Sequence, residues 1–315
     1  MKTEPIEEIL PQNPVEGLIS LLSKLSFTLN EVVNFGTKIL DWDLKKTRSG
    51  KDKNVPSVFL RNSIELGDAI SLLIEKSSID PAKILIRSLM ENAFGLLYMI
   101  EKDEDLRAHS FLVCRANKDI RYYKQFIESE DISKNFVSKL IKQEPDFKLE
   151  NHCNPTEIKA VIKAKEELLN LPIYDVVNIE YHRTCNKNEK GNNNPNWYSL
   201  YNGPNNFESL CYYLENTILY DFQYRKYSEN VHVINVMKGF VKSKDGLDKA
   251  DLIQVRDFKD CKEVFYNGVN ILLDLYREYI KNRLPEKQLE YDNWHNEFVK
   301  LFKKTDWETR FIFRE

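Results

Sequence analysis

Glycine and proline are scarce in this sequence, with only 10 glycines and 11 prolines among 315 residues. A β-sandwich or β-barrel needs many tight turns, and these two residues are the commonest turn formers. Their scarcity therefore argues against a turn-rich β fold. The chain instead contains long stretches rich in leucine, isoleucine, lysine and glutamate, in which apolar residues recur every three or four positions. This periodicity predicts α-helices.

The sequence also lacks an apolar run long enough to span a membrane, for which about 18 uncharged residues are needed. The most apolar stretch, 84–100, is interrupted by Arg87 and Glu91, as expected for a helix inside a bundle. The N-terminal residues are acidic and do not resemble the basic start and apolar core of a signal peptide. We therefore expect a cytoplasmic protein without membrane contact.

No strong net charge and no cysteine framework are present. The chain has 46 basic and 49 acidic residues, for a net charge of −3, so nucleic-acid binding would require a local basic patch. Five scattered cysteines suit a reducing compartment. His152 and Cys153 with His182 and Cys185 make a poor zinc set, because adjacent side chains rarely reach one ion. We expect no metal site and no cofactor.

The periodicity predicts an all-α, multi-helix bundle. Pro81 after Asp80, and Pro155 after Asn154, are typical of helix starts in which the aspartate or asparagine is the N-cap. A short strand is possible near 252–255. Helices are expected at about 15–44 (one long or two short), 56–76, 80–100, 103–126, 132–143, 155–170, 206–237, 257–283 and 287–303.

One long loop interrupts this pattern at 183–206, where nine asparagines accompany two glycines and two prolines. Loops of this length in compact domains are functional or mobile. The expected organisation is an N-terminal helical segment (1–54), a helical core domain (55–240) and a C-terminal helical extension packed on the core (241–315). The asparagine-rich loop precedes the helix that carries the strongest candidate site.

Arg87 and Glu91 form the first candidate site. They lie four positions apart and so share one helical face, with Tyr98 further along the same polar stripe of a very apolar helix. A buried polar stripe must be satisfied by a neighbouring helix or by a ligand. The residues therefore allow either an internal network or a binding pocket.

The second candidate site is the stretch 224–232. Arg225 and His232 are seven positions apart, so they lie within about 20° of each other on a helix, with Ser228 between them. Histidine can transfer a proton near neutral pH, and arginine can hold a phosphate through two hydrogen bonds. This combination suits metal-independent phosphodiester cleavage with the ribose 2′-OH as nucleophile. Tyr227 is a further candidate for ligand binding. The alternative is a purely structural role, in which Arg225 forms an ion pair with Glu229 and His232 packs against the core.

Two family resemblances accompany these residues. The order of Arg87 and Glu91, then the tryptophan–tyrosine stretch at 197–198, then Ser228 and His232 resembles a bacterial family of unknown function, DUF5677. That resemblance implies an all-α bundle but no established reaction. Val233 stands where we expect a glycine in that family.

Arg225 and His232, with six residues between them, also resemble the Arg-x(4–6)-His motif of the HEPN superfamily. That superfamily includes metal-independent ribonucleases of toxin–antitoxin and phage-defence systems that work as dimers. Lys226 departs from the polar Asn or Asp that usually follows the arginine there.

The resemblance implies a HEPN-like endoribonuclease in stress response or phage defence, acting on RNA as a homodimer, with Arg225, His232 and Ser228 as catalytic residues. An operon-encoded partner protein is also expected. The residues leave open whether the chain is an enzyme at all. The alternative is a non-catalytic sensing or interaction module, in which Arg87, Glu91, Tyr98 and Tyr227 bind a nucleotide-like ligand or a partner protein.

Overall fold

The computed structural model describes residues 3–12, 16–47, 54–127, 130–187, 194–231, 239–242 and 250–305. They belong to two compact units, one made of Met1–Lys102 with Cys211–Glu315 and the other of Asp103–Leu210. Throughout these ranges, every helix is too short or too polar to cross a lipid bilayer. We call the first of the two compact units (Met1–Lys102 with Cys211–Glu315) the bundle unit and the second (Asp103–Leu210) the middle unit.

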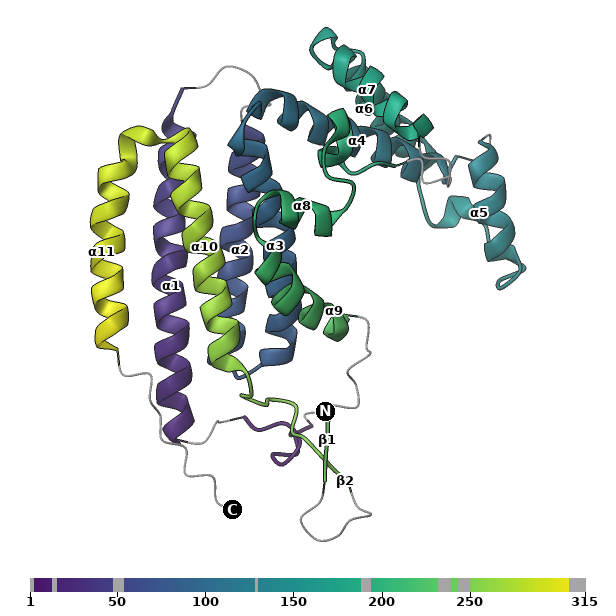
Figure 1. Cartoon of the computed structure of the whole chain (residues 1–315). Helices are drawn as coiled ribbons and strands as arrows, with labels where there is room; N and C mark the ends of the chain where they lie inside the picture. Colours follow the sequence, from purple (N-terminus) through teal and green to yellow (C-terminus); the bar gives the residue numbers. More distant parts are fainter. Residues whose placement is uncertain are drawn as a thin grey trace. The chain divides into compact units, whose positions relative to one another are not determined.

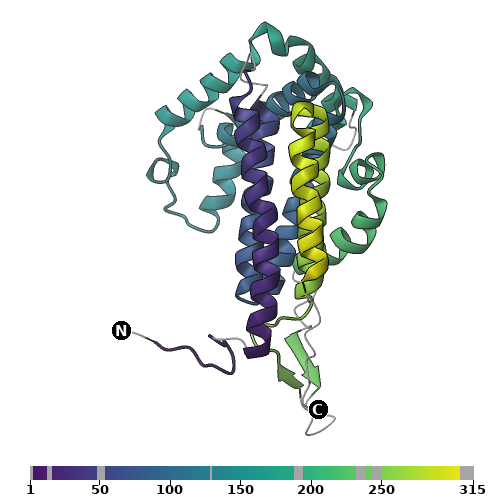
Figure 2. The same cartoon turned by 90° about the vertical axis from the view of Figure 1, so that its left-hand side faces the viewer.

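Four long helices form the centre of the bundle unit: α1 (Glu16–Lys45), α2 (Val55–Glu75), α3 (Ile79–Glu101) and α10 (Cys261–Arg283). They run side by side, and α10 contacts the other three (Figure 1). A fifth helix, α11 (Gln288–Lys304), runs alongside α1 (Figure 2), where the rings of Trp294 and Phe35 stack at 3.9 Å. The expectation of an all-α bundle is thereby confirmed.

The helices pack closely because each carries an apolar stripe on the face turned to its neighbours. In α10 this stripe includes Phe265, Leu272, Tyr276 and Tyr279, none of which is exposed. Gly36 of α1 lets Tyr276 approach, since a Cβ at Gly36 would lie 2.7 Å from its Cζ atom and closer still to its hydroxyl oxygen. A larger residue at position 36 is therefore incompatible with this packing.

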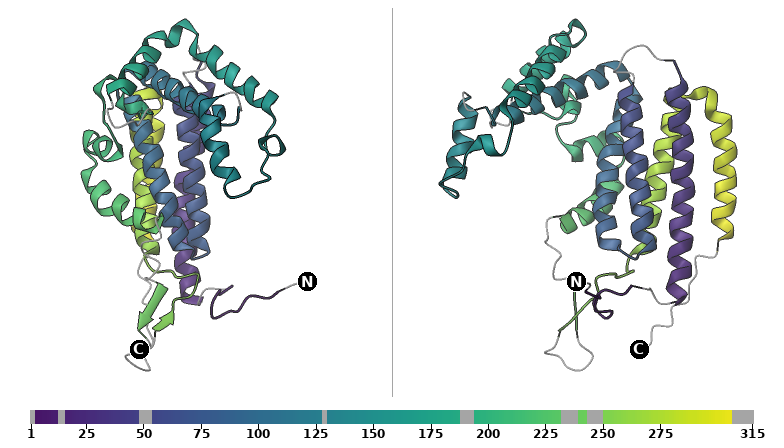
Figure 3. Two further views of the ribbon diagram at one scale, coloured as in Figure 1. Left: turned by 90° about the vertical axis from the view of Figure 1, so that its right-hand side faces the viewer. Right: turned by 180° about the vertical axis from the view of Figure 1, so that it is seen from behind.

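The rest of the bundle unit is less regular. Strands β1 (Phe240–Lys242) and β2 (Ala250–Leu252) pair antiparallel just before α10 (Figure 3), and they form the one sheet among the described residues. The short strand expected near 252–255 thus ends at Leu252.

The middle unit contains α4 (Glu104–Lys124), α5 (Asp131–Ile141), α6 (Pro155–Leu169) and α7 (Asp175–Lys187), followed by a 3-10 segment at Trp197–Asn202. Its core joins Val113 and Cys114 of α4 to Val177 and Tyr181 of α7. The start signal at Asn154 is confirmed, because its side chain accepts a hydrogen bond from the Thr156 amide. Asn154 is thus the N-cap of α6.

Two expected boundaries within helices were wrong. The helix expected at 206–237 is broken into α8 (Phe207–Tyr213), a π-helical segment (Leu219–Tyr224) and α9 (Arg225–Val231). The first break follows from Glu215, whose φ of 59° is left-handed and cannot continue a helix. Asp80 is not an N-cap either: α3 begins at Ile79 after Ser78, and Asp80 bonds to Lys83 instead.

The asparagine-rich loop is shorter than expected, because α7 continues to Lys187 and Trp197–Asn202 is 3-10 helical; residues 188–193 lie outside the described ranges. The two units also divide the chain differently from the expected segments 1–54, 55–240 and 241–315. The physical reason is that α1 and α10 bury their apolar faces against each other and against α2. Both ends of the chain therefore contribute helices to the centre of the bundle, and the expected three-segment organisation stays a prediction.

Candidate functional site

Arg225 is the first residue of α9 and directly follows the π-helical segment Leu219–Tyr224. π-Helical turns are rare, and they are frequent at functional sites because the wider turn redirects side chains. The Arg225 guanidinium forms an ion pair with Asp221 (Nε to Oδ1, 3.4 Å) and lies over the Tyr220 ring, 5.4 Å from its centroid. With 59% of its side chain exposed, Arg225 remains accessible to a ligand.

Of the other two expected catalytic residues, the structure describes Ser228. The Ser228 hydroxyl donates to the main-chain carbonyl of Tyr224 at 2.8 Å, a bond within its own helix. His232 lies outside the described residues, so its pairing with Arg225 stays a prediction.

Arg87 and Glu91 meet α9 through Tyr224. Arg87 Nη2 donates to the Tyr224 hydroxyl at 3.0 Å, and that hydroxyl donates to Glu91 Oε1 at 2.6 Å. Arg87 Nε lies 3.3 Å from the same carboxylate oxygen. Burial and then the Glu91 carboxylate raise the pKa of Tyr224, so the phenol keeps its proton at neutral pH. The Tyr224 side chain, from the π-helical segment, thus satisfies part of the polar stripe expected on this helix, while the buried Arg87 Nε forms no hydrogen bond among the described residues.

The two tyrosines and the two arginines form one layered arrangement. The rings of Tyr220 and Tyr224 stack with centroids 5.2 Å apart and planes 18° apart. Arg87 lies 4.9 Å from the Tyr224 centroid, while Arg225 lies over Tyr220. We call Arg87, Glu91, Tyr220, Tyr224 and Arg225 the Arg–Tyr site.

The Arg–Tyr site combines two abilities. Guanidinium groups can bind phosphates, and both aromatic rings and guanidinium planes are surfaces on which the bases of single-stranded RNA can stack. The sequence analysis included Tyr224 in the candidate stretch 224–232 without giving it a role, and it missed Tyr220 as a member of the site. Their spacing of four positions was a usable signal, because such residues are neighbours on a helix.

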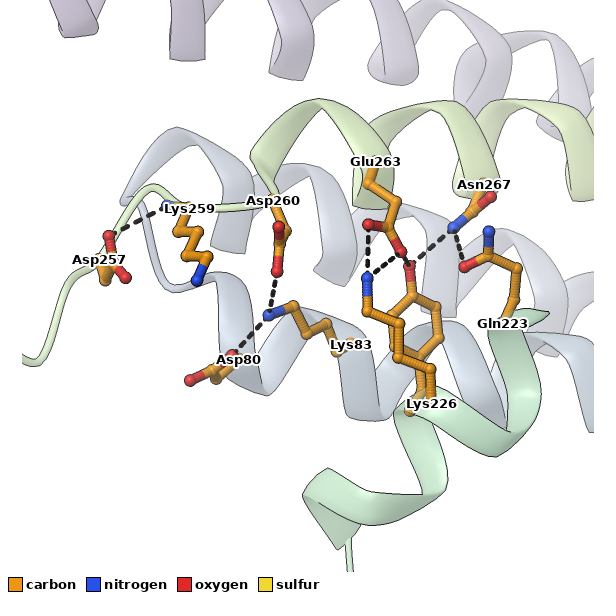
Figure 4. Close-up of polar contacts among 10 residues, drawn as sticks. Asp80, Lys83, Gln223, Lys226, Asp257, Lys259, Asp260, Glu263 and Asn267 are labelled. Atoms are coloured by element: carbon orange, nitrogen blue, oxygen red, sulfur yellow. Dashed lines mark hydrogen bonds and ion pairs between the residues drawn. The ribbon is translucent and has the colours of Figure 1, made fainter. Parts of the chain in front are cut away.

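Tyr227 does not line an open site. It is completely buried, and its hydroxyl donates to Glu263 Oε1 at 2.9 Å and accepts from Asn267 Nδ2 at 2.7 Å. Lys226 binds the same glutamate at 2.7 Å, and Gln223 accepts from Asn267 (Figure 4). This network attaches α9 to α10, so Tyr227 fixes the orientation of the helix that carries Arg225.

A second network ties the start of α3 to the start of α10. Lys83 Nζ lies 2.8 Å from Asp80 and 2.9 Å from Asp260 (Figure 4). Burial by itself would lower the pKa of Lys83, but its hydrogen bonds to the two carboxylates outweigh burial and raise it. Lys83 therefore remains charged and links the start of α3 to the start of α10.

Tyr98 is also buried, with 7% exposed, and its ring meets that of Tyr213 edge to face at 5.4 Å. The Tyr213 hydroxyl in turn donates to Glu101 at 3.0 Å. Tyr98 therefore belongs to the packing of α3 against the end of α8.

No group of three or more His, Cys, Asp or Glu side chains in the part of the chain that the structure describes is arranged to hold a metal ion. All five cysteines are free thiols, and burial raises the pKa of Cys114 to about 12.

The described residues define a predominantly α-helical protein whose π-helical segment places two stacked tyrosines beside Arg225 of α9 and Arg87 of α3. The chain belongs to DUF5677, a family of unknown function whose model matches residues 53–248. This confirms the first resemblance, and the matched range contains the whole Arg–Tyr site together with His232. No curated protein and no solved structure matches the chain significantly.

Proposed function

We propose that this protein is a HEPN-like, metal-independent endoribonuclease that acts in stress response or phage defence as a homodimer. The observation that carries the proposal is Arg225, which is largely exposed and stands over a tyrosine ring at the start of α9. Arg225 would hold the scissile phosphate, and Tyr220 would stack on a neighbouring base.

The proposed reaction is an internal transfer. The ribose 2′-hydroxyl gives up its proton as its oxygen attacks phosphorus, the bond from phosphorus to the 5′-oxygen breaks, and the leaving 5′-oxygen takes up a proton. The products are a 2′,3′-cyclic phosphate and a 5′-hydroxyl end. His232 would take or give the proton, an assignment that rests on its sequence spacing from Arg225.

The remaining members of the Arg–Tyr site would act indirectly. Arg87 and Glu91 hold the Tyr224 hydroxyl from both sides, and Tyr224 supports the Tyr220 ring by stacking. They would therefore position the surface on which RNA lies, without touching the scissile bond.

The test is cleavage of a labelled single-stranded RNA by the purified full chain, with EDTA present. We expect the wild type to cleave to a 2′,3′-cyclic phosphate, and Arg225→Ala and His232→Ala each to lower the rate by about 100-fold or more. Arg61→Ala is the matched control, because Arg61 is equally exposed and forms a similar ion pair, with Glu65. Wild-type cleavage by a folded His232→Ala protein would refute the assignment.

A second candidate function is a non-catalytic module that binds a nucleotide-like ligand or a partner protein at the Arg–Tyr site. It is favoured by Ser228, whose hydroxyl bonds to its own helix, and by Arg225, which already pairs with Asp221. This reading predicts that nucleotides raise the melting temperature, that Arg225→Ala removes the shift, and that RNA stays intact.

A further inference from the structure

A cavity of about 440 Å³ in the middle unit has a distinctive lining. Arg121 and Lys124 come from the last turn of α4, and His182 comes from α7. Three asparagine side chains, Asn117, Asn186 and Asn194, also line it. Among the described residues that line it, none is an aspartate or a glutamate.

Arg121 and Lys124 differ from neighbouring cations, which have a carboxylate partner within the described part of the chain. On the same helix, Asp119 lies 2.9 Å from Arg115 and 3.1 Å from Lys165. Among the described residues, by contrast, the side chains of Arg121 and Lys124 form no ion pair or hydrogen bond. Positive groups gathered around one cavity without counter-charges attract an anion.

The helix dipole alone partly explains why Arg121 and Lys124 lie at the end of α4, without any bound anion. Cations in the last turn of a helix are stabilised by the helix dipole. That effect does not extend to His182 and Asn186, which lie four positions apart on α7 and therefore face the cavity together. Two helices thus supply cationic and amide donors to the same space.

The size and the remaining wall of the cavity indicate the class of ligand. Its volume lies within the range of about 300–1,000 Å³ typical of small-molecule sites. Ile120, Ile132 and the ring of Tyr181 add an apolar wall, against which a flat base can pack. We propose that this cavity binds a nucleoside phosphate, with Arg121, Lys124 and His182 around the phosphate.

The one thiol among the described lining residues, Cys185, is not an activated nucleophile. Burial, the largest influence, raises the pKa of Cys185 above its ordinary value, although a hydrogen bond with Tyr181 opposes this. A protonated thiol reacts poorly as a nucleophile. The proposal is also independent of RNA cleavage, because none of its residues belongs to the Arg–Tyr site.

Isothermal titration of the full chain with AMP, ATP and inorganic phosphate tests the proposal. We expect at least one nucleotide to bind more tightly than phosphate, and Arg121→Ala to weaken that binding about tenfold or more, as the loss of one charge-assisted hydrogen bond implies. Lys118→Ala is the matched control, because Lys118 is exposed on the same helix and does not line the cavity.

Three outcomes would overturn the proposal. The first is no nucleotide binding at millimolar concentration. The second is an equal effect of Arg121→Ala and Lys118→Ala. The third is loss of binding in Arg225→Ala with Arg121→Ala unaffected, which would move the nucleotide to the Arg–Tyr site. Arg121 is exposed, so circular dichroism should show that its alanine variant stays folded.

Discussion

The buried ion pair between Asp43 and Arg283 should contribute more to the stability of the bundle unit than any surface pair. The two side chains are 0% and 1% exposed, and Arg283 Nη2 lies 3.0 Å from Asp43 Oδ2. That carboxylate also accepts hydrogen bonds from Ser57 and Tyr279. Asp43 therefore joins α1 to α2 and α10 at one point of the core.

We expect Asp43→Asn to lower the free energy of unfolding by about 3–5 kcal/mol. Asparagine has nearly the same volume, so no cavity forms, but the Arg283 cation is left buried without its counter-charge. With a urea dependence of about 2 kcal/mol per molar, the denaturation midpoint should fall by roughly 2 M. Urea denaturation at neutral pH, followed by circular dichroism, measures this shift.

The stability that the Asp43–Arg283 pair contributes should also depend on pH in the acid range. Burial raises the pKa of Asp43, but Arg283 and the hydrogen bonds outweigh burial and hold the pKa below its ordinary value of 3.8. Because the folded-state pKa is lowered, the stabilisation is present above pH 3.8 and is lost as the pH falls through the folded-state pKa. Asp43→Asn should lack this part of the acid dependence.

The control is Asp41→Asn on the same helix. Asp41 pairs with Lys45 at 2.6 Å, but both side chains are more than half exposed, so its loss should cost less than about 1 kcal/mol. A loss below about 1 kcal/mol for Asp43→Asn as well would refute the argument from burial.

Three further variants test the packing, each by urea denaturation. Tyr276→Phe should raise stability by about 1 kcal/mol, because the Tyr276 hydroxyl is buried without a hydrogen-bond partner; a loss would contradict this. Gly36→Ala should lower stability by about 1–3 kcal/mol, because the new Cβ overlaps the Tyr276 ring; an unchanged midpoint would show that the helices separate freely. Tyr224→Phe should cost about 1.5–3 kcal/mol, because it removes the hydrogen bonds to Arg87 and Glu91, and no loss would mean that water replaces them.

The helices were predictable where one apolar stripe faces a core. The sequence periodicity at 56–76 and 257–283 matches α2 and α10 to within a few residues. Helix α7 was missed because it has apolar residues on its outer face too: Val176 and Ile179 are 67% and 70% exposed. With apolar residues on both faces, the contrast that identifies an amphipathic helix is weak.

The sequence by itself determined the helical class and the absence of a long apolar span, because both follow from composition and hydrophobic periodicity. It also determined the pairing of Arg87 with Glu91, because residues four positions apart are neighbours on the face of one helix. Only the tertiary structure decided that Tyr224 joins that pair across 133 positions of chain, that Tyr227 is buried, and that Asp43 meets Arg283. Such contacts depend on how helices pack against one another, and periodicity within one helix carries no information about its neighbour's position.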